Sequence, residues 1–230
     1  RRERNPLRQV TLLGPQRLEP TLIEAIRDQG ITGKVATITA GWQEREDEDR
    51  ELHDHLEGRT HNLRLYDRVS RIFDHDSELR EAFRERQDRL KKLQRFYRVR
   101  LDHVLDAARE LLAIDEEDDL LEEHRASAIR DLQLLDEEHI ENVRRIHEQY
   151  QHETNPGGRD EVRKHRDEVR SEIEACDALA IAGGHVAILL NRLRLLDIPG
   201  ACGEKPLFLW SAGAMALSKR VVLFHDSPPQ

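Results

Sequence analysis

The stretch Pro206-Leu-Phe-Leu-Trp-Ser-Ala-Gly-Ala-Met215 decides how this chain is expected to fold. Its apolar residues predict a short buried strand, and the small residues after Ser211 predict a sharp turn into a helix. A serine at such a turn is raised above the sheet, with its hydroxyl exposed and the backbone N–H groups of the next helix pointing toward it. This is the arrangement that a nucleophilic serine needs.

A second interpretation of the same stretch stays open. The usual nucleophile elbow has glycine two residues before the serine, and here that position is Leu209. The stretch therefore also fits a buried strand-to-helix connection in which Ser211 only caps the helix. Short motifs of this kind produce many false matches, so residues elsewhere in the chain have to decide between the two.

The composition indicates a compact part joined to a long solvated helical part. The chain has 230 residues, of which 37% are hydrophobic and 36% charged, and its formal net charge is −9. That balance is too polar for one compact globule of this length. The acidic balance also disfavours nucleic acid as a partner.

Other classes of protein and site are disfavoured by what the sequence lacks. Two cysteines, Cys176 and Cys202, allow one disulfide but give no disulfide framework or paired-cysteine metal site. The histidines, including His53 and His55, lack the spacing of a zinc site on a helix. No apolar run reaches membrane-spanning length, and residues 1–9 lack a signal-peptide core. We therefore expect a cytoplasmic protein with no metal, no cofactor and no membrane partner.

Glycine and proline cluster at the two ends of the chain, which divides it into three parts. Residues 1–43 are expected to form a strand at 10–13, a helix at 19–29 and a strand at 34–39. Residues 177–230 return to the same pattern, with strands at 178–181, 206–209 and 221–224. Because neither part alone could bury both faces of a sheet, the strands of both should belong to one parallel sheet. The expected fold class is therefore α/β, with a discontinuous domain made of residues 1–43 and 177–230.

The middle part, residues 44–176, is expected to be a helical insertion. Apolar residues recur there at alternating spacings of three and four, as in a coiled coil: Leu79, Phe83, Leu90, Leu93, Tyr97, Leu101, Val104, Ala108 and Leu111. The acidic run at 115–119 and the turn at 155–158 separate this helix from two more. Long helices joined by short turns should pack antiparallel. Such an arm could serve self-association, and we expect a homo-oligomer.

Residues 180–190 (Ala-Ile-Ala-Gly-Gly-His-Val-Ala-Ile-Leu-Leu) and 210–214 (Trp-Ser-Ala-Gly-Ala) together resemble a known family. They are similar to the peptidase E and cyanophycinase group of serine peptidases, peptidase family S51. The resemblance covers residues 177–229 well and 10–41 loosely, and it does not cover the helical middle. It implies the fold of class I glutamine amidotransferases, a three-layer structure built on a parallel sheet.

The resemblance also implies roles for particular residues. Ser211 matches the nucleophile. The backbone N–H of Ala212 and an N–H of Gly183 or Gly184 match the oxyanion hole, whose donors stabilise the charge that develops on the attacked carbonyl. Asp226 matches an acidic residue that orients or tunes a catalytic histidine.

Further candidates come from where the residues fall along the chain. His225 follows the strand expected beside the elbow and is a candidate general base, or a loop residue that shapes the site. His185, Trp42, Gln43 and Trp210 are candidates for contacts with substrate. For His185 the alternative is packing at the start of a helix, and for Trp42 it is covering the base of the insertion.

The chain also departs from the family pattern. His185 and Met215 stand where family members have asparagine, and the catalytic histidine of the family lies further downstream than Gln230. A serine hydroxyl without a base is a poor nucleophile. We therefore expect the α/β domain to be incomplete at its C-terminal end.

Two functions remain open from the sequence. The first is a serine hydrolase that cleaves a peptide or small amide through an acyl-enzyme on Ser211. The second is a catalytically inactive relative that acts as a binding or scaffold protein through its helical arm. A glutamine amidotransferase is disfavoured because those enzymes use a cysteine nucleophile and the elbow holds serine.

Overall fold

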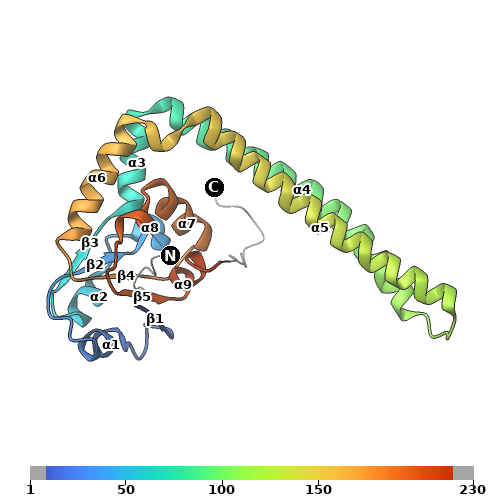
Figure 1. Ribbon diagram of the computed structural model, residues 1–230, viewed down its shortest axis with the longest axis horizontal. Coiled ribbons are helices and arrows are strands. Elements are labelled where there is room, and N and C mark those ends of the chain that lie inside the picture. The colour runs from blue at the N-terminus through green and yellow to red at the C-terminus, as the bar shows by residue number, and fades with distance from the viewer. Residues whose placement is uncertain (1–8, 220–230) are drawn as a thin grey trace, which may run out of the picture. The chain divides into compact units, whose positions relative to one another are not determined.

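The computed structural model describes residues 9–219 (Figure 1). Within these residues the chain is an α/β protein with a five-stranded parallel sheet. The described residues divide into two compact units, one formed by residues 9–77 together with 156–219, and the other by Glu78–Asn155. The expected strand at 221–224, His225 and Asp226 lie outside the described residues.

The sheet has the strand order β1-β5-β4-β2-β3, and every neighbouring pair is parallel. Its strands are β1 (Val10–Leu13), β2 (Val35–Ile38), β3 (Thr60–Asn62), β4 (Ala178–Ile181) and β5 (Leu207–Trp210). β2 and β4 pair directly although 139 residues separate Ile38 from Ala178 in the sequence. The prediction that strands from both ends of the chain share one sheet is confirmed.

β3 lies within residues 44–176, for which the sequence predicts only helices. It pairs with β2 at the edge of the sheet. Its three residues, Thr60-His-Asn62, are all half-buried and polar, so they show neither an apolar run nor an alternating pattern. An edge strand of this length therefore left no signal in the sequence.

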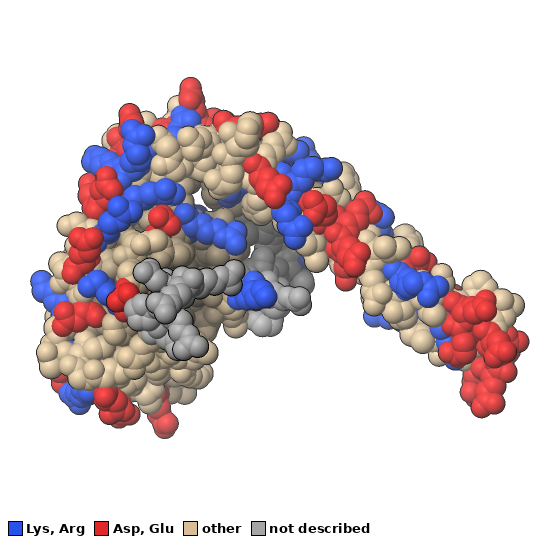
Figure 2. Space-filling model, viewed as in Figure 1, with Lys and Arg blue, Asp and Glu red and all other residues tan. Residues whose placement is uncertain are grey.

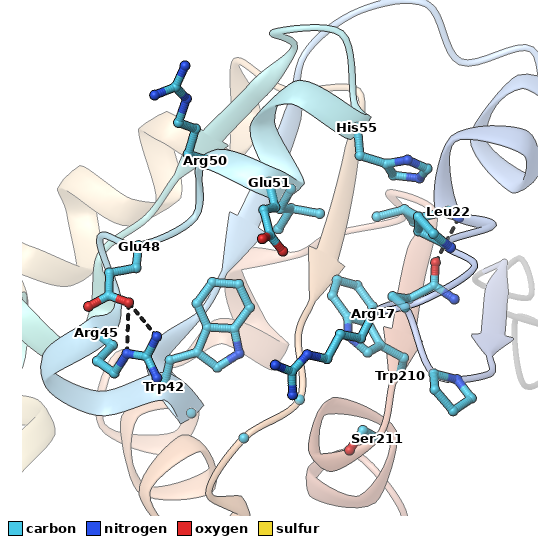
Figure 3. A pocket seen from close by; sticks show the side chains of 17 residues that line it. Arg17, Leu22, Trp42, Arg45, Glu48, Arg50, Glu51, His55, Trp210 and Ser211 are labelled. Carbon is cyan, nitrogen blue, oxygen red and sulfur yellow. Dashed lines mark hydrogen bonds and ion pairs between the residues drawn. The ribbon is translucent and has the colours of Figure 1, made fainter.

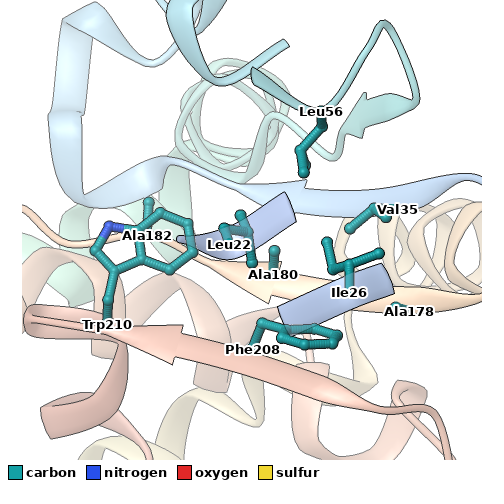
Figure 4. Close-up of a cluster of buried hydrophobic side chains, with 9 residues drawn as sticks. All are labelled: Leu22, Ile26, Val35, Leu56, Ala178, Ala180, Ala182, Phe208 and Trp210. Atoms are coloured by element: carbon teal, nitrogen blue, oxygen red, sulfur yellow. The ribbon is translucent and has the colours of Figure 1, made fainter. Parts of the chain in front are cut away.

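Helices pack on both faces of the sheet. On one face, Leu22 and Ile26 of α1 (Leu22–Asp28) pack with Phe208, Trp210 and further buried residues of the central strands (Figure 4). On the other face lie helices that contact one another. They are α3 (Leu65–His75), α6 (Asp160–Glu174), α7 (Val186–Leu195), α8 (Ile198–Ala201) and α9 (Ala212–Ala216). Because the residues of β2, β4 and β5 are all buried, these central strands carry near-continuous apolar sequence.

The remaining elements of this unit are short. They are the 3₁₀ helix η1 (Ala40–Arg45), α2 (Arg50–His55) and the 3₁₀ helix η2 (Pro156–Gly158). The boundaries between the compact units therefore differ from those expected at 43 and 177. β3 joins the sheet and α6 packs on α3, so both belong with the strands.

The second unit consists of two long helices, α4 (Ser77–Ala113) and α5 (Asp119–Thr154). Arg89 of α4 is joined to Gln149 of α5, whereas Tyr97 and Arg100, further along α4, are joined to Asp136 and Glu138, nearer the start of α5. Later positions of α4 therefore lie against earlier positions of α5. Asp118 caps α5, and its carboxylate accepts hydrogen bonds from the N–H groups of Leu120 and Leu121.

Across residues 9–219, no helix combines the length and the apolar character needed to cross a membrane.

Candidate functional site

Ser211 occupies the turn between β5 and α9. Its backbone angles are φ 49° and ψ −124°, a conformation that residues other than glycine rarely adopt and that costs of order 1–3 kcal/mol. Its side chain is exposed, while Ala212 and Gly213 behind it are buried. The strand, sharp turn and helix expected around Ser211 are therefore present, and the serine stands at the strained position.

The small residues after Ser211 let α9 begin close to the sheet. A Cβ atom at Gly213 would lie 2.3 Å from the carbonyl oxygen of Ile181, so no larger residue fits there. Leu209 lies inside β5, buried and paired with Ile181. The turn thus forms without a glycine two residues before the serine.

The loop that follows β4 lies against Ser211. A Cβ atom at Gly183 would be 2.9 Å from Ser211 Cβ and 3.0 Å from its Oγ. Gly184 has a φ of +110°, and a Cβ there would be 2.3 Å from the carbonyl oxygen of Gly41. The backbone N–H of His185 donates to that same oxygen at 2.7 Å. The segments that follow β2, β4 and β5 therefore meet at one point, and the lack of a Cβ at Gly183 and Gly184 lets them approach this closely.

A pocket of about 1170 Å³ opens beside Ser211 (Figure 3). Five of the residues singled out in the sequence line it, namely Ser211, Gly183, Gly184, Trp42 and Trp210. It lies beyond the carboxyl ends of parallel strands, where folds of this type bind their ligands. The structure thus brings together the serine, the glycine pair and both tryptophans.

Three other candidates do not line this pocket. Ala212 is buried behind Ser211. His185 caps α7, and its Nδ1 accepts a hydrogen bond from the N–H of Ile188 at 3.4 Å, which matches the packing alternative for this residue. Gln43 has φ 62° and ψ −127°, nearly the same backbone conformation as Ser211, and the sequence gave no sign of it.

Asn62 of β3 positions the loop that carries Trp42. Its Nδ2 donates to Thr39 Oγ1 at 2.9 Å, to the carbonyl oxygen of Glu46 at 3.1 Å and to Asp49 Oδ2 at 2.9 Å. Thr39 Oγ1 also donates to the Glu46 carbonyl oxygen at 2.9 Å. The unexpected edge strand therefore fixes one wall of the pocket.

Sequence reasoning missed the charged side chains that line the pocket, and it considered His55, which also lines the pocket, only as a zinc ligand. The charged residues are Arg17, Arg45, Glu48, Arg50 and Glu51. Arg17 extends into the pocket in Figure 3. Arg45 Nε donates to Glu48 Oε2 at 2.7 Å, and this hydrogen bond holds the pKa of the Glu48 carboxyl below its usual value. Arg17 and Glu48 lie in loops, and the others lie in η1 and α2, so only their position beyond the strand ends could indicate a site.

His55 is a pocket histidine, but its ring is engaged elsewhere. Its Nε2 accepts a hydrogen bond from the backbone N–H of Ile23 at 3.1 Å, at the start of α1. Burial lowers the pKa of His55, which favours the neutral ring that can accept this bond. His55 therefore joins α2 to α1 beside the pocket.

Within residues 9–219, no group of three or more histidine, cysteine or acidic residues is placed to hold a metal ion. Cys176 and Cys202 are both buried free thiols, so the disulfide that the sequence allowed is not formed.

The strained backbone of Ser211 leads to a prediction about stability. Glycine adopts a positive φ without steric cost, whereas alanine keeps the strain. We expect Ser211→Gly to be more stable than Ser211→Ala by about 1 kcal/mol in the free energy of unfolding, measured by urea denaturation. Equal stability of the two variants, or a more stable Ser211→Ala, would contradict a positive φ at this position.

Comparison of the chain with protein-family models, with curated proteins and with solved structures found no match in any of the three.

Proposed function

We propose that this protein is a serine hydrolase that cleaves a peptide or a small amide through an acyl-enzyme on Ser211. The observation that carries the proposal is the backbone of Ser211, which is held at a strained positive φ between a buried strand and a helix, with its side chain exposed at a pocket. Strain of this kind persists where the surrounding structure supports it and is concentrated at functional sites.

The chemistry follows from the residues around the serine. Ser211 Oγ attacks the substrate carbonyl carbon, and the amine leaves as the acyl-enzyme forms. The N–H of Ala212 and an N–H of the Gly183–Gly184 loop are proposed to stabilise the oxyanion, since Gly183 lies directly against Ser211. Water then hydrolyses the acyl-enzyme and restores the serine. His225 and Asp226, which lie outside the described residues, are proposed as the base and the residue that orients it.

The pocket indicates how a substrate would be held. Trp42 and Trp210 supply apolar surface near Ser211, and Arg17 supplies a cation. We further propose that the sheet belongs to the class I glutamine-amidotransferase-like fold, in a form that carries α4 and α5 as a long antiparallel insertion. The resemblance around residues 180–190 and 210–214 supports this assignment, as does the parallel sheet.

Labelling with a fluorophosphonate tests the proposal, because this reagent reacts covalently with activated serines. We expect the full-length native protein to be labelled and Ser211→Ala to be unlabelled. Ser218→Ala is the matched control, since Ser218 is also exposed but lies at the far end of α9 and donates to the carbonyl oxygen of Met215. If the native protein is not labelled, or if label persists in Ser211→Ala, the serine hydrolase is excluded.

One observation favours the second candidate, a binding or scaffold protein without catalysis. His55 and His185, the described histidines at or beside the pocket, both accept hydrogen bonds from backbone N–H groups. Under this alternative the pocket would bind a ligand without turning it over. Native protein that binds a peptide but neither hydrolyses it nor reacts with the fluorophosphonate would identify this case.

A further inference from the structure

Charge is segregated along the two-helix unit formed by α4 and α5. Residues 89–100 of α4, called here the basic stretch, contain six cations and no acidic residue: Arg89, Lys91, Lys92, Arg95, Arg98 and Arg100. Residues 115–123, called here the acidic tip, contain seven acidic residues and no cation: Asp115, Glu116, Glu117, Asp118, Asp119, Glu122 and Glu123. The tip is the connection between α4 and α5 together with the first turn of α5, and Figure 2 shows its acidic side chains gathered at the end of this unit.

Only some of these charged side chains form ion pairs or hydrogen bonds within the unit. Arg100 pairs with Glu138 at 2.8 Å, Arg89 donates to Gln149 and Asp118 caps α5. In the described part of the chain, no ion pair or hydrogen bond is formed by the side chains of Lys92, Asp115, Glu116 or Glu117. Crowding like charges at the tip costs free energy, and this cost is relieved when a cationic surface binds there.

Both charged regions also expose large apolar side chains. Phe96 and Val99, in the basic stretch, are 56% and 57% exposed. Beside and within the acidic tip, Leu112 and Leu120 are 54% and 62% exposed. By contrast, Leu121, Ala128 and Leu135 are buried along the seam between α4 and α5. Each region therefore has exposed apolar side chains within a run of charges of one sign, and α5 adds Glu138, Glu141 and Glu148 beside the basic stretch.

The two regions are spaced so that two copies of this unit can pair with each other. Lys92 lies 21 positions before Ala113, the end of α4, or about 32 Å at 1.5 Å per residue, and the acidic tip begins two residues after Ala113. If two such units lie side by side and antiparallel about a twofold axis near Val104, each tip meets the basic stretch of the other copy. The same pairing then occurs twice, as an isologous interface requires.

We propose that the α4–α5 unit is a dimerisation surface, and that its partner is the same unit of a second copy of this chain, packed antiparallel with acidic tip against basic stretch. The proposal rests on the charges and exposed apolar residues of this unit alone, and it holds whether or not Ser211 is a nucleophile. The proposal specifies the expected homo-oligomer: it is a dimer, it forms through the α4–α5 unit, and the two units pack antiparallel.

The mass of the full chain in solution is the first test. Sedimentation equilibrium over a range of protein concentrations should give a dimer, and its dissociation constant should rise when salt is added, because salt screens the pairing of exposed charges. A chain that remains monomeric at every concentration and salt level overturns the proposal. This holds also if the unit binds another protein in place of a second copy.

An exchange of charges tests the surface and the direction together. The tip variant carries Glu116→Lys and Glu117→Lys, and the stretch variant carries Lys92→Glu and Arg95→Glu. Each should dimerise at least about tenfold more weakly than the native chain, because the net charge of the tip falls from −7 to −3 in the one variant and that of the stretch from +6 to +2 in the other. All four positions are exposed. Because Lys92 and Arg95 lie near Phe96 on α4, circular dichroism should confirm that both variants keep their helix content.

Mixing the two variants should restore dimers. In the mixed dimer the lysine tip of one copy meets the glutamate stretch of the other, and the native tip and native stretch form the second pair. Mass analysis of an equimolar mixture, with one variant labelled, should therefore find heterodimers that are more stable than the homodimer of either variant. Variants that still dimerise alone, or a mixture that stays monomeric, would each contradict the antiparallel pairing.

Discussion

Ser211→Ala is expected to lower the rate of amide or ester hydrolysis by about 10⁶-fold, which is the scale of loss when an enzyme of this type loses its nucleophile. The reason is that the hydroxyl is the group that forms the acyl-enzyme, while the pocket and the glycine loop remain in place. The measurement is kcat/KM of the full-length native protein, on a substrate identified by screening peptides and activated esters.

Two comparisons make this result specific. Ser218→Ala should retain native kcat/KM, because Ser218 lies outside the pocket lining. Trp42→Ala should raise KM more than it lowers kcat, because Trp42 offers binding surface rather than a reacting group. If Ser211→Ala retained the native rate, the hydrolysis would be assigned to another residue and Ser211 to a structural role.

Gly184→Ala is expected to lower the free energy of unfolding by about 3–5 kcal/mol. Gly184 has a φ of +110°, and an added Cβ would lie 2.3 Å from the carbonyl oxygen of Gly41 and 2.4 Å from its carbonyl carbon. Both are backbone atoms of the neighbouring segment, so the clash cannot be relieved by rotating a side chain. The segments after β2 and β4 would have to separate.

Gly14→Ala provides the matched control for this substitution. Gly14 lies in a loop of the same unit, and no atom lies within 4 Å of a Cβ built there. Its free energy of unfolding should stay within about 0.5 kcal/mol of the native value in urea denaturation. Equal stabilities for Gly184→Ala and Gly14→Ala would show that the two glycine segments do not meet as described.

The sequence could predict the centre of this fold because its signals there are local. Buried parallel strands are short apolar runs, and the elbow needs small residues next to one of them, so β4, β5 and the position of Ser211 followed from the pattern. The glycine pair was found for the same reason, since Gly183 and Gly184 follow directly after β4.

The parts that the sequence did not predict depend on tertiary packing. β3 has three polar residues and is a strand only because β2 lies beside it. Gln43 has a positive φ although it is not a residue type that indicates a turn. Arg17 lines the pocket only because the loop after β1 turns toward it. The sequence predicts a helical insertion over residues 44–176 because the helical pattern of the middle part continues into α6. In the structure α6 packs on α3 and belongs to the unit that contains the sheet.

The acyl-enzyme itself is the most direct test of the central claim. The native full-length protein is mixed with an activated ester and quenched in acid, and its intact mass and peptide masses are measured. We predict one acyl group per chain, on the peptide that contains Ser211, appearing within the first turnover and lost in Ser211→Ala. An absent adduct, or an adduct on any other residue, would contradict the assignment of Ser211 as the nucleophile.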